Sequence, residues 1–485
     1  MNYKMVGFVL GRIFLIEAAL MLFPMGCAAI YGEWASLPAF LIPVLILLVL
    51  GLAASLKSPK DTKIYARDGL AIVALVWVLL SVFGALPFVI TGEIPSFVDA
   101  FFETVSGFTT TGSTILTDVE SLSHGTLFWR SFSHWVGGMG VLVFAMAVLP
   151  MTDGRAMHLM RAEVPGPTCG KLSSKLSDSA KILYGIYFAM TALEVVFLCA
   201  GGMSLYESLI HSFGTAGTGG FSNRGLSIGA YQNPYFEWVI GIFMLLFGVN
   251  FNLYYFILMR HFREAFGSEE LRAYLGIVLF STVTIAANIL SMVGSVGEAV
   301  RTAFFQVSSI ITTTGYATAD FNLWPTYSRI LLLVLMFVGG CAGSTAGGLK
   351  MSRVIIFFKA ARQDLNKMLH THAVTTIRFE GKPLDEKTLQ GVHNYFNVYM
   401  LLLMLSTVLV SLDGFDLTTT FTAVITCINN VGPGMELVGP MGNFSQFSAP
   451  VKYLLSFDML AGRLELYPML AMFAPRLWRR RRTMR

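Results

Sequence analysis

Four short segments of the sequence carry the residues that could do chemistry. Each begins with an apolar stretch of helical character, continues with small or hydroxyl residues and reaches a glycine. The four segments are 95–113, 209–221, 303–316 and 421–434. They recur at intervals of roughly a hundred residues, and repetition at a near-constant period indicates one architecture more strongly than any single motif does.

The chemistry that these segments suit is the binding of a dehydrated cation. Each is too short and too interrupted to span a bilayer, and non-helical backbone inside a membrane is tolerated only where it lines a polar cavity. Loops around one axis can offer backbone carbonyls in place of an ion's hydration shell. The helical stretch before each loop would direct its negative C-terminal end at the same cavity, and glycine permits the backbone angles that this needs.

An alternative interpretation is that these Thr-Gly pairs are ordinary turns in membrane loops. That interpretation accounts for any single copy, but four copies in register, each between two apolar runs, favour a pore. The fourth copy has Asn430-Val431 where the first and third copies have two threonines. We therefore expect it to be the least filter-like of the four.

A fifth segment interrupts the apolar run 328–358 with glycines. Five of them fall within ten residues, at Gly339, Gly340, Gly343, Gly347 and Gly348. Each destabilises a helix by about 1 kcal/mol relative to alanine. Small residues can also serve close packing between membrane helices, but these five cover more than one helix face. The pattern therefore predicts an unwound segment below the loops.

One charged residue falls inside the last apolar run. A charge at the depth of Arg463 is costly and normally faces a cavity or a partner. The alternative is local pairing with Asp458 or Glu465 near the helix end. Two further polar residues, Glu103 and His211, are expected near the mouth of the pathway and not in catalysis.

The elements that must position these segments are membrane-spanning helices. The chain has 485 residues, of which 55% are apolar and 13% charged, with a mean hydropathy of +0.65. Soluble chains carry about 25% charged residues, and one bilayer crossing needs about 20 mainly apolar residues. Ten such runs are predicted, at 6–30, 37–56, 69–91, 127–150, 180–201, 235–259, 271–294, 328–358, 391–411 and 449–475. The expected fold class is therefore an all-α integral membrane protein.

The basic residues predict the orientation of these helices. Lys and Arg concentrate in alternate links, at 57–68, 151–181, 260–272 and 350–387, and in the tail 479–485. Because cytoplasmic loops carry the excess of Lys and Arg, both termini are expected in the cytoplasm. The tail is interpreted as a topology anchor attracted to anionic lipid, ahead of a dedicated partner site. No clear cleavage site follows the first apolar run, so a retained helix is expected there.

Several classes of function are disfavoured by what the sequence contains. The five cysteines stand singly, which suggests neither a zinc site nor a disulfide framework. No GxxxxGK[ST] phosphate loop is present, so an ATP-driven pump within this chain is not expected. A transporter of organic solutes would show two repeats around a midplane site, and a membrane-embedded enzyme would need clustered acidic or histidine residues in its spans. We expect no enzyme and no cofactor, and whether H⁺ or Na⁺ accompanies the ion stays open.

Four motifs stand at the loops: TTTGS around Gly112, TGGF at 218–221, TTTGYATADF at 312–321 and NNVGPG at 429–434. With these motifs the sequence resembles the Trk/Ktr/HKT superfamily of potassium transporters. The helical pair 6–56 ahead of the first motif looks like the TrkH branch and not the shorter Ktr branch. The resemblance extends over essentially the whole chain.

The resemblance implies four unequal, pseudo-fourfold helix–pore-loop–helix repeats in one subunit. The implied domains are an N-terminal two-helix extension (1–60), repeat 1 (65–155), repeat 2 (176–262), repeat 3 with a gating loop (270–360), repeat 4 (388–478) and the basic tail (479–485). In the family the glycine-rich break is an intramembrane loop that obstructs the pore, and an arginine in the last span contacts it.

The resemblance also implies the site residues. Gly112, Gly219, Gly315 and Gly432 would occupy the filter glycine positions. The full implied set for the selectivity filter and K⁺ binding is Thr110, Thr111, Gly112, Gly217, Thr218, Gly219, Thr313, Thr314, Gly315, Asn430, Val431 and Gly432. The implied gate set is Gly339, Gly340, Gly343, Ser344, Thr345, Ala346, Gly347, Gly348, Lys350 and Arg463.

By this resemblance, the expected function is K⁺ uptake across the cytoplasmic membrane through one central pore. Some plant relatives that prefer Na⁺ carry serine at the first filter glycine, and Gly112 therefore favours K⁺. The alternative is a less selective or Na⁺-permeable channel or symporter of the same fold. The implied partners are K⁺ as the transported ligand, a second copy of the chain, a separate TrkA-type cytosolic nucleotide-binding ring and membrane lipid; no nucleic acid is expected.

Overall fold

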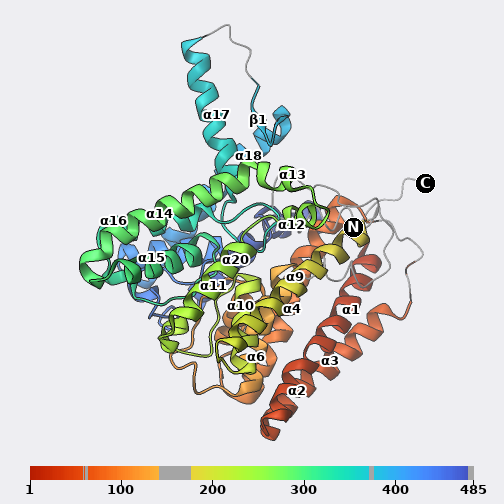
Figure 1. Ribbon diagram of the computed structural model, residues 1–485. Coiled ribbons are helices and arrows are strands. Elements are labelled where there is room, and N and C mark those ends of the chain that lie inside the picture. Colours follow the sequence, from red (N-terminus) through yellow and green to blue (C-terminus); the bar gives the residue numbers. More distant parts are fainter. Residues whose placement is uncertain (58, 60–63, 141–175, 371–375, 479–485) are drawn as a thin grey trace, which may run out of the picture.

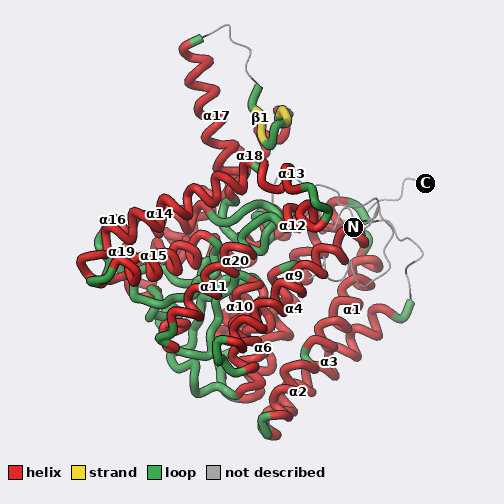
Figure 2. Tube along the Cα trace, in the orientation of Figure 1, coloured by secondary structure: helices red, strands yellow, loops and turns green. Residues whose placement is uncertain are grey.

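The computed structural model describes the chain except for residues 58, 60–63, 141–175, 371–375 and 479–485. Helices make up most of the described part, and its strands form one short antiparallel hairpin of β1 (Arg378–Phe379) and β2 (Lys382–Pro383) (Figure 2). The all-α class predicted from composition is confirmed. The predicted basic tail, and most of the predicted basic link 151–181, lie outside the described residues.

An N-terminal helical group stands at one side of the molecule (Figure 1). It consists of α1 (Tyr3–Leu20), α2 (Leu22–Ile30), the short 3₁₀ turn η1 (Trp34–Ser36) and α3 (Leu37–Ser55). Glycines let α1 and α3 approach closely, because a Cβ on Gly11 would lie 3.0 Å from the Gly51 oxygen and one on Gly51 would lie 2.9 Å from the Gly11 oxygen. Close approach at small residues is how membrane helices associate.

The rest of the described chain repeats one pattern four times: a long helix, a short buried helix and a second helix. The long helices are α4 (Ala66–Thr91), α9 (Leu176–Ala200), α14 (Glu269–Val293) and α18 (Glu386–Val410). The short helices are α5 (Phe97–Phe108), α10 (Leu205–Gly217), α15 (Val296–Ile311) and α19 (Leu417–Asn429). The second helices are α6 (His124–Gly138), α11 (Pro234–Phe247) with α12 (Phe251–Leu258), α16 (Thr326–Val338) with α17 (Met351–Leu369), and α20 (Ala449–Arg463) with α21 (Tyr467–Met472).

Side-chain caps fix where three of the short helices begin. Ser96, Ser204 and Asp416 each accept a hydrogen bond from a backbone N–H in the first turn of the helix that follows. Such capping satisfies N–H groups that have no partner within the helix. The C-terminal halves of the short helices are buried on every side, although they contain serine, threonine and other polar residues. They therefore lie inside the protein and not against lipid.

Most second helices are interrupted, whereas the sequence predicted a break in the run 328–358 alone. Six helices of the described residues are long and apolar enough to cross a membrane, or seven when α11 and α12, bent by 92° at their break, count as one span. The predicted span 328–358 is broken between α16 and α17, as the glycines indicated, and 449–475 breaks between α20 and α21. Residues 141–150 of the predicted span 127–150 lie outside the described residues.

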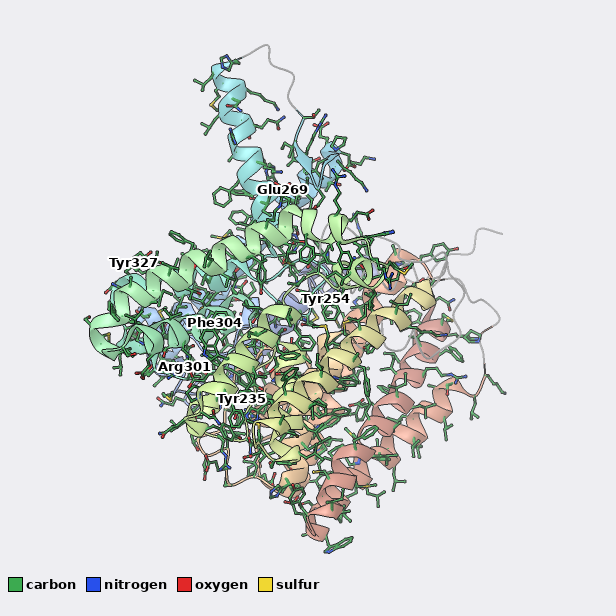
Figure 3. The ribbon with its side chains drawn as sticks, in the orientation of Figure 1. Tyr235, Tyr254, Glu269, Arg301, Phe304 and Tyr327 are labelled. Atoms are coloured by element: carbon green, nitrogen blue, oxygen red, sulfur yellow. The ribbon has the colours of Figure 1, made fainter. Side chains whose placement is uncertain are left out.

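Short elements join the long ones. They are α13 (Phe262–Gly267), α22 (Pro475–Trp478) and the 3₁₀ turns η2 (Ser227–Tyr231), η3 (Phe321–Leu323), η4 (Ser411–Asp413) and η5 (Glu436–Val438). α17 extends away from the helical body as a single helix, and the β1–β2 hairpin lies beside its base (Figure 1). Glu269, labelled in Figure 3, marks the end of α14 that meets this base.

Candidate cation pathway

Each short helix ends in a loop with the same backbone conformation. The first non-helical turn contains a non-glycine residue in the left-handed region, at Thr110 (φ 56°), Thr218 (φ 56°), Thr313 (φ 56°) and Asn430 (φ 55°). Two residues later stands a glycine with positive φ, at Gly112 (83°), Gly220 (78°), Gly315 (86°) and Gly432 (99°). Positive φ is unfavourable for a β-branched residue, and such strain persists where the surrounding structure enforces it, often at functional sites.

Backbone hydrogen bonds enforce this conformation in the same way in all four loops. The residue after the left-handed one donates its N–H to the carbonyl five positions earlier in the short helix. These bonds are Thr111 N to Ser106 O (2.9 Å), Gly219 N to Gly214 O (2.8 Å), Thr314 N to Ser309 O (2.8 Å) and Val431 N to Thr426 O (3.0 Å). They occupy carbonyls that the helix end would otherwise leave without a partner. The fourth loop, expected to be the least filter-like, therefore has the same backbone as the others.

The second loop requires a correction of register by one residue. Gly219 was expected to match Gly112, Gly315 and Gly432, but the positive-φ glycine of this loop is Gly220. Gly219 instead matches Thr111, and Gly217 is the last residue of α10 and not part of the loop turn. Two adjacent glycines made both registers possible in the sequence, and only the backbone conformation distinguishes them.

The four loops meet in a closed ring. A Cβ built on each positive-φ glycine would collide with, or closely approach, a carbonyl oxygen of the next loop. The four approaches are Gly112 to Gly219 O (2.1 Å), Gly220 to Thr314 O (2.0 Å), Gly315 to Val431 O (2.3 Å) and Gly432 to Thr111 O (2.9 Å). Loop 1 thus contacts loop 2, loop 2 contacts loop 3, loop 3 contacts loop 4, and loop 4 returns to loop 1. Only glycine fits at these approaches.

Side chains add further links between neighbouring loops. Ser113 Oγ donates to Gly432 O (3.1 Å), and Asn430 Nδ2 donates to Thr111 Oγ1 (2.9 Å), so loops 1 and 4 are joined twice. The Tyr316 hydroxyl lies 3.2 Å from Phe221 O and joins loops 3 and 2. A hollow at one end of the ring is lined by residues of all four loops, among them Gly112, Gly220, Gly315 and Gly432.

Helix α6 braces the first two loops with buried polar side chains. Arg130 pairs with Glu103 of α5, with 2.6 Å between Nε and Oε1, and donates to Ser222 O of the second loop (3.0 Å). His134 donates from Nδ1 to Gly107 O (2.7 Å), which sets the tautomer of its ring. The sequence predicted Glu103 near the mouth but not its partner, because Arg130 is the single arginine of α6 and no local pattern connects it with Glu103.

The glycine-rich break forms a non-helical segment, which we call the gate loop (339–350). Gly339, Gly343 and Gly348 have φ of 70°, 71° and 76°, and Lys350 has φ 75°. The loop lies directly against the ring, because Gly347 N donates to Thr313 Oγ1 (2.6 Å) and Gly348 N donates to Asn429 O (3.0 Å).

Contacts within the gate loop and with the break between α11 and α12 hold several further predicted gate residues. Cys341 N donates to Gly248 O (2.9 Å) and Phe251 N donates to Gly343 O (3.1 Å), both at that break. Ser344 Oγ donates to Cys341 O (2.6 Å). The ammonium group of Lys350 donates to Ala346 O. The bend in the second repeat is therefore part of the same structure as the gate loop.

Arg463 fastens the gate loop to α6. Its guanidinium donates to Thr345 O (2.7 Å) in the loop, and to Gly137 O (2.7 Å) and Gly138 O (2.5 Å) at the end of α6. The alternative partners are engaged elsewhere: Glu465 pairs with Arg353, and Asp458 accepts from Ser406 (2.9 Å).

A second anchor of the gate loop was not foreseen. Oε1 of Glu270, in the first turn of α14, accepts from Ala342 N (2.7 Å) and from Ser352 N (3.0 Å). One carboxylate oxygen thus holds the early part of the gate loop and the first turn of α17, which follows it. Glu270 lies 72 residues before the nearer of these partners, so no local sequence pattern connects them.

Comparison with known proteins agrees with this architecture. The sequence matches the TrkH family, described as cation transport protein, over residues 36–290 and 275–480. The chain belongs to the TrkH family of cation transport proteins. It is 35% identical to the Trk system potassium uptake protein TrkH of Escherichia coli K12 over 487 residues, covering 99% of this chain and all of that protein. It is 34% identical to the Trk system potassium uptake protein TrkG of the same organism, covering 99% of each.

A solved structure supports the fold as well. The crystal structure of the potassium transporter TrkH from Vibrio parahaemolyticus is similar with a TM-score of 0.88 at 31% identity, over 99% of this chain and 100% of that one. The predicted resemblance to the TrkH branch is thereby confirmed. As a TrkH-family member with several apolar helices, the chain is a multi-pass membrane transport protein and not an enzyme.

Proposed function

We propose that this TrkH-family chain takes up K⁺ across the cytoplasmic membrane through a single pathway at the centre of the four loops. The observation that carries the proposal is the closed ring of glycine-to-carbonyl approaches, Gly112–Gly219, Gly220–Thr314, Gly315–Val431 and Gly432–Thr111. A ring of backbone carbonyls can replace the hydration shell of an ion. The relatives named as potassium uptake proteins, together with glycine at position 112, support K⁺ as the ion.

The corrected register changes the proposed filter set. The left-handed residue, the residue after it and the positive-φ glycine make up the filter segment of each loop. In the second loop these are Thr218, Gly219 and Gly220, in place of Gly217, Thr218 and Gly219. The other three loops keep the expected residues: Thr110, Thr111 and Gly112; Thr313, Thr314 and Gly315; and Asn430, Val431 and Gly432.

The gate loop is proposed to close this pathway on the cytoplasmic side of the filter. It lies against loops 3 and 4 and is held by Arg463 and Glu270. The guanidinium also adds a positive charge where a cation would leave the filter. An inside-negative potential of about 100 mV would supply about 2.3 kcal/mol per charge for inward movement.

We also propose a regulatory partner and an oligomeric state for this chain, because it belongs to the TrkH family. We propose from the basic links that both termini are cytoplasmic. The projecting α17 would then lie on the cytoplasmic side, where a TrkA-type nucleotide-binding ring could contact it. Because α17 begins directly after the gate loop, movement of this helix would be transmitted to the gate. A homodimer is proposed on family grounds.

The proposed uptake is tested by complementation. A bacterial strain that lacks its own K⁺-uptake systems should grow at low K⁺ when it expresses this chain, and it should accumulate rubidium. K⁺ in excess should compete with rubidium uptake, whereas Na⁺ should compete weakly. Failure of a well-expressed chain to restore growth or rubidium uptake would contradict the proposal. Equal competition by Na⁺ would favour the less selective cation pathway.

The Glu270 anchor gives a prediction for the gate. Glu270→Ala removes the acceptor of two buried N–H groups, each of which costs about 1–3 kcal/mol when left without a partner. We expect a lower unfolding temperature of the purified protein and a higher basal rubidium flux, because the gate loop and the start of α17 lose a common anchor. Glu269→Ala is the matched control, since this adjacent, half-buried carboxylate pairs with Lys359 and not with the loop. Unchanged stability and flux in Glu270→Ala would contradict the anchor.

A further inference from the structure

Four buried polar side chains recur at one level of the short helices, just behind the loops. Glu103, His211 and Gln306 each stand seven residues before the left-handed residue of their loop, and Thr422 stands eight residues before it. Their exposed fractions are 1%, 0%, 0% and 1%. A polar side chain buried this deeply is expected to have a hydrogen-bonding task.

Each of these side chains holds the segment that leaves its own loop. Glu103 accepts from Thr114 Oγ1 (2.9 Å) and Ile115 N (3.0 Å). The Gln306 amide oxygen, in the orientation that satisfies both of its groups, accepts from Thr318 N (2.9 Å).

The other two repeats achieve the same link with different groups. His211 Nδ1 donates to Glu207 O (2.7 Å), so its Nε2 is the acceptor for the Ser222 hydroxyl (3.0 Å). Thr422 Oγ1 accepts from Met435 N (3.0 Å) and donates to Thr418 O (2.8 Å). In every repeat the buried side chain bonds to a residue that lies two to three positions after the positive-φ glycine of its loop.

We propose that Glu103, His211, Gln306 and Thr422 form a filter collar that sets the K⁺ preference of the pathway by positioning the outgoing segment of each loop. The inference rests on the proposed function and deepens it. These are positioning residues: the backbone of the loops would meet the ion, and the collar fixes where that backbone lies. The collar uses four different functional groups for one geometric task, which explains why no shared sequence motif marks it.

The first repeat is the most strongly braced part of the collar. Arg130 pairs with Glu103 and also donates to Ser222 O, so it links the collar residue of loop 1 to the outgoing segment of loop 2. The guanidinium lies 3.5 Å from the centre of the Phe221 ring. Removal of Glu103 would leave this buried arginine without its carboxylate, which is strongly destabilising. The fourth repeat, with a single hydroxyl, is the part that can be changed with the least risk to folding.

The test uses the purified full-length chain in planar lipid bilayers, with K⁺ on one side and Na⁺ on the other. The permeability ratio is read from the reversal potential, which does not depend on how many molecules are active. Thr422→Val and Gln306→Leu are each expected to lower the K⁺/Na⁺ ratio at least about threefold, because a lost buried hydrogen bond frees the outgoing segment. Thr420→Val is the matched control: this threonine of the same helix is also buried, and within the described residues its hydroxyl bonds only to Phe415 O.

The outcomes distinguish failure of the collar proposal from failure of the proposed K⁺ pathway. If Thr422→Val and Gln306→Leu both keep the wild-type ratio, the collar is overturned and the proposed function stands. If the wild-type chain itself conducts no K⁺, the proposed function is overturned and the collar falls with it. A fall in the ratio in Thr420→Val equal to that in Thr422→Val would also overturn the collar, because loss of any buried hydroxyl would then suffice.

Discussion

Replacement of Gly220 by serine is expected to abolish most of the preference for K⁺ over Na⁺. Gly220 has φ 78°, and a Cβ at this position would lie 2.0 Å from Thr314 O of the next loop. A neighbouring backbone cannot give way as a flexible side chain can, so loops 2 and 3 must separate. We expect the K⁺/Na⁺ permeability ratio to fall about tenfold or more, which corresponds to about 1.4 kcal/mol of discrimination.

The measurement is the reversal potential under bi-ionic conditions, compared with that of Gly112→Ser and of a control. Gly112→Ser should have a similar effect, because its Cβ would lie 2.1 Å from Gly219 O. Gly294→Ser is the matched control: it has φ 79° but nothing within 4 Å of the added Cβ, at the end of α14. An unchanged ratio in Gly220→Ser would contradict both the corrected register and the filter assignment.

Replacement of Arg463 by alanine is expected to raise the basal cation flux about tenfold or more. The guanidinium makes charge-assisted hydrogen bonds to Thr345 O of the gate loop and to Gly137 O and Gly138 O of α6. Hydrogen bonds to charged groups contribute about 1.5–3 kcal/mol each, so their loss favours release of the loop. The substitution also removes a positive charge from the proposed exit of the filter.

The measurement is rubidium flux into liposomes that contain equal amounts of wild-type or Arg463→Ala protein. Arg329→Ala serves as the control, because Arg329 pairs with Glu436 away from the gate loop. The K⁺/Na⁺ ratio of Arg463→Ala should match that of the wild type, since the ring of loops is unchanged. A lower flux from a normally folded Arg463→Ala protein would show that Arg463 supports the open pathway, contrary to the gate proposal.

The sequence predicted the helices and loops well because their signals are local. Apolar runs located the long helices, and four similar motifs located the loops. The register of the second loop was missed because Gly219 and Gly220 are adjacent, and a glycine can adopt either the ordinary or the positive-φ conformation. The bend between α11 and α12 was missed because its sequence contains one glycine, Gly248, and the hydrogen bond from Cys341 N to Gly248 O comes from a distant part of the chain.

The other features that the sequence did not predict depend on contacts between residues that are far apart in the chain. Five glycines predicted that the eighth apolar run would break, but not that Glu270 would hold both the early part of the gate loop and the first turn of α17. Arg463 was recognised from the cost of a charge within an apolar run, yet local pairing stayed possible until its carbonyl partners were located. The side chains of the fourth loop differ from those of the other loops. Asn430 nevertheless adopts nearly the same φ as the left-handed threonines of the other three loops.

The most direct test of the central claim is the reversal potential of the purified wild-type chain between K⁺ and Na⁺ solutions. The ratio obtained is independent of how often the gate opens. A pathway formed by the ring of four loops predicts a clear preference for K⁺ that collapses in Gly220→Ser and survives in Gly294→Ser. Equal permeability of the wild type to K⁺ and Na⁺, or a preference untouched by Gly220→Ser, would contradict a selective pathway through this ring.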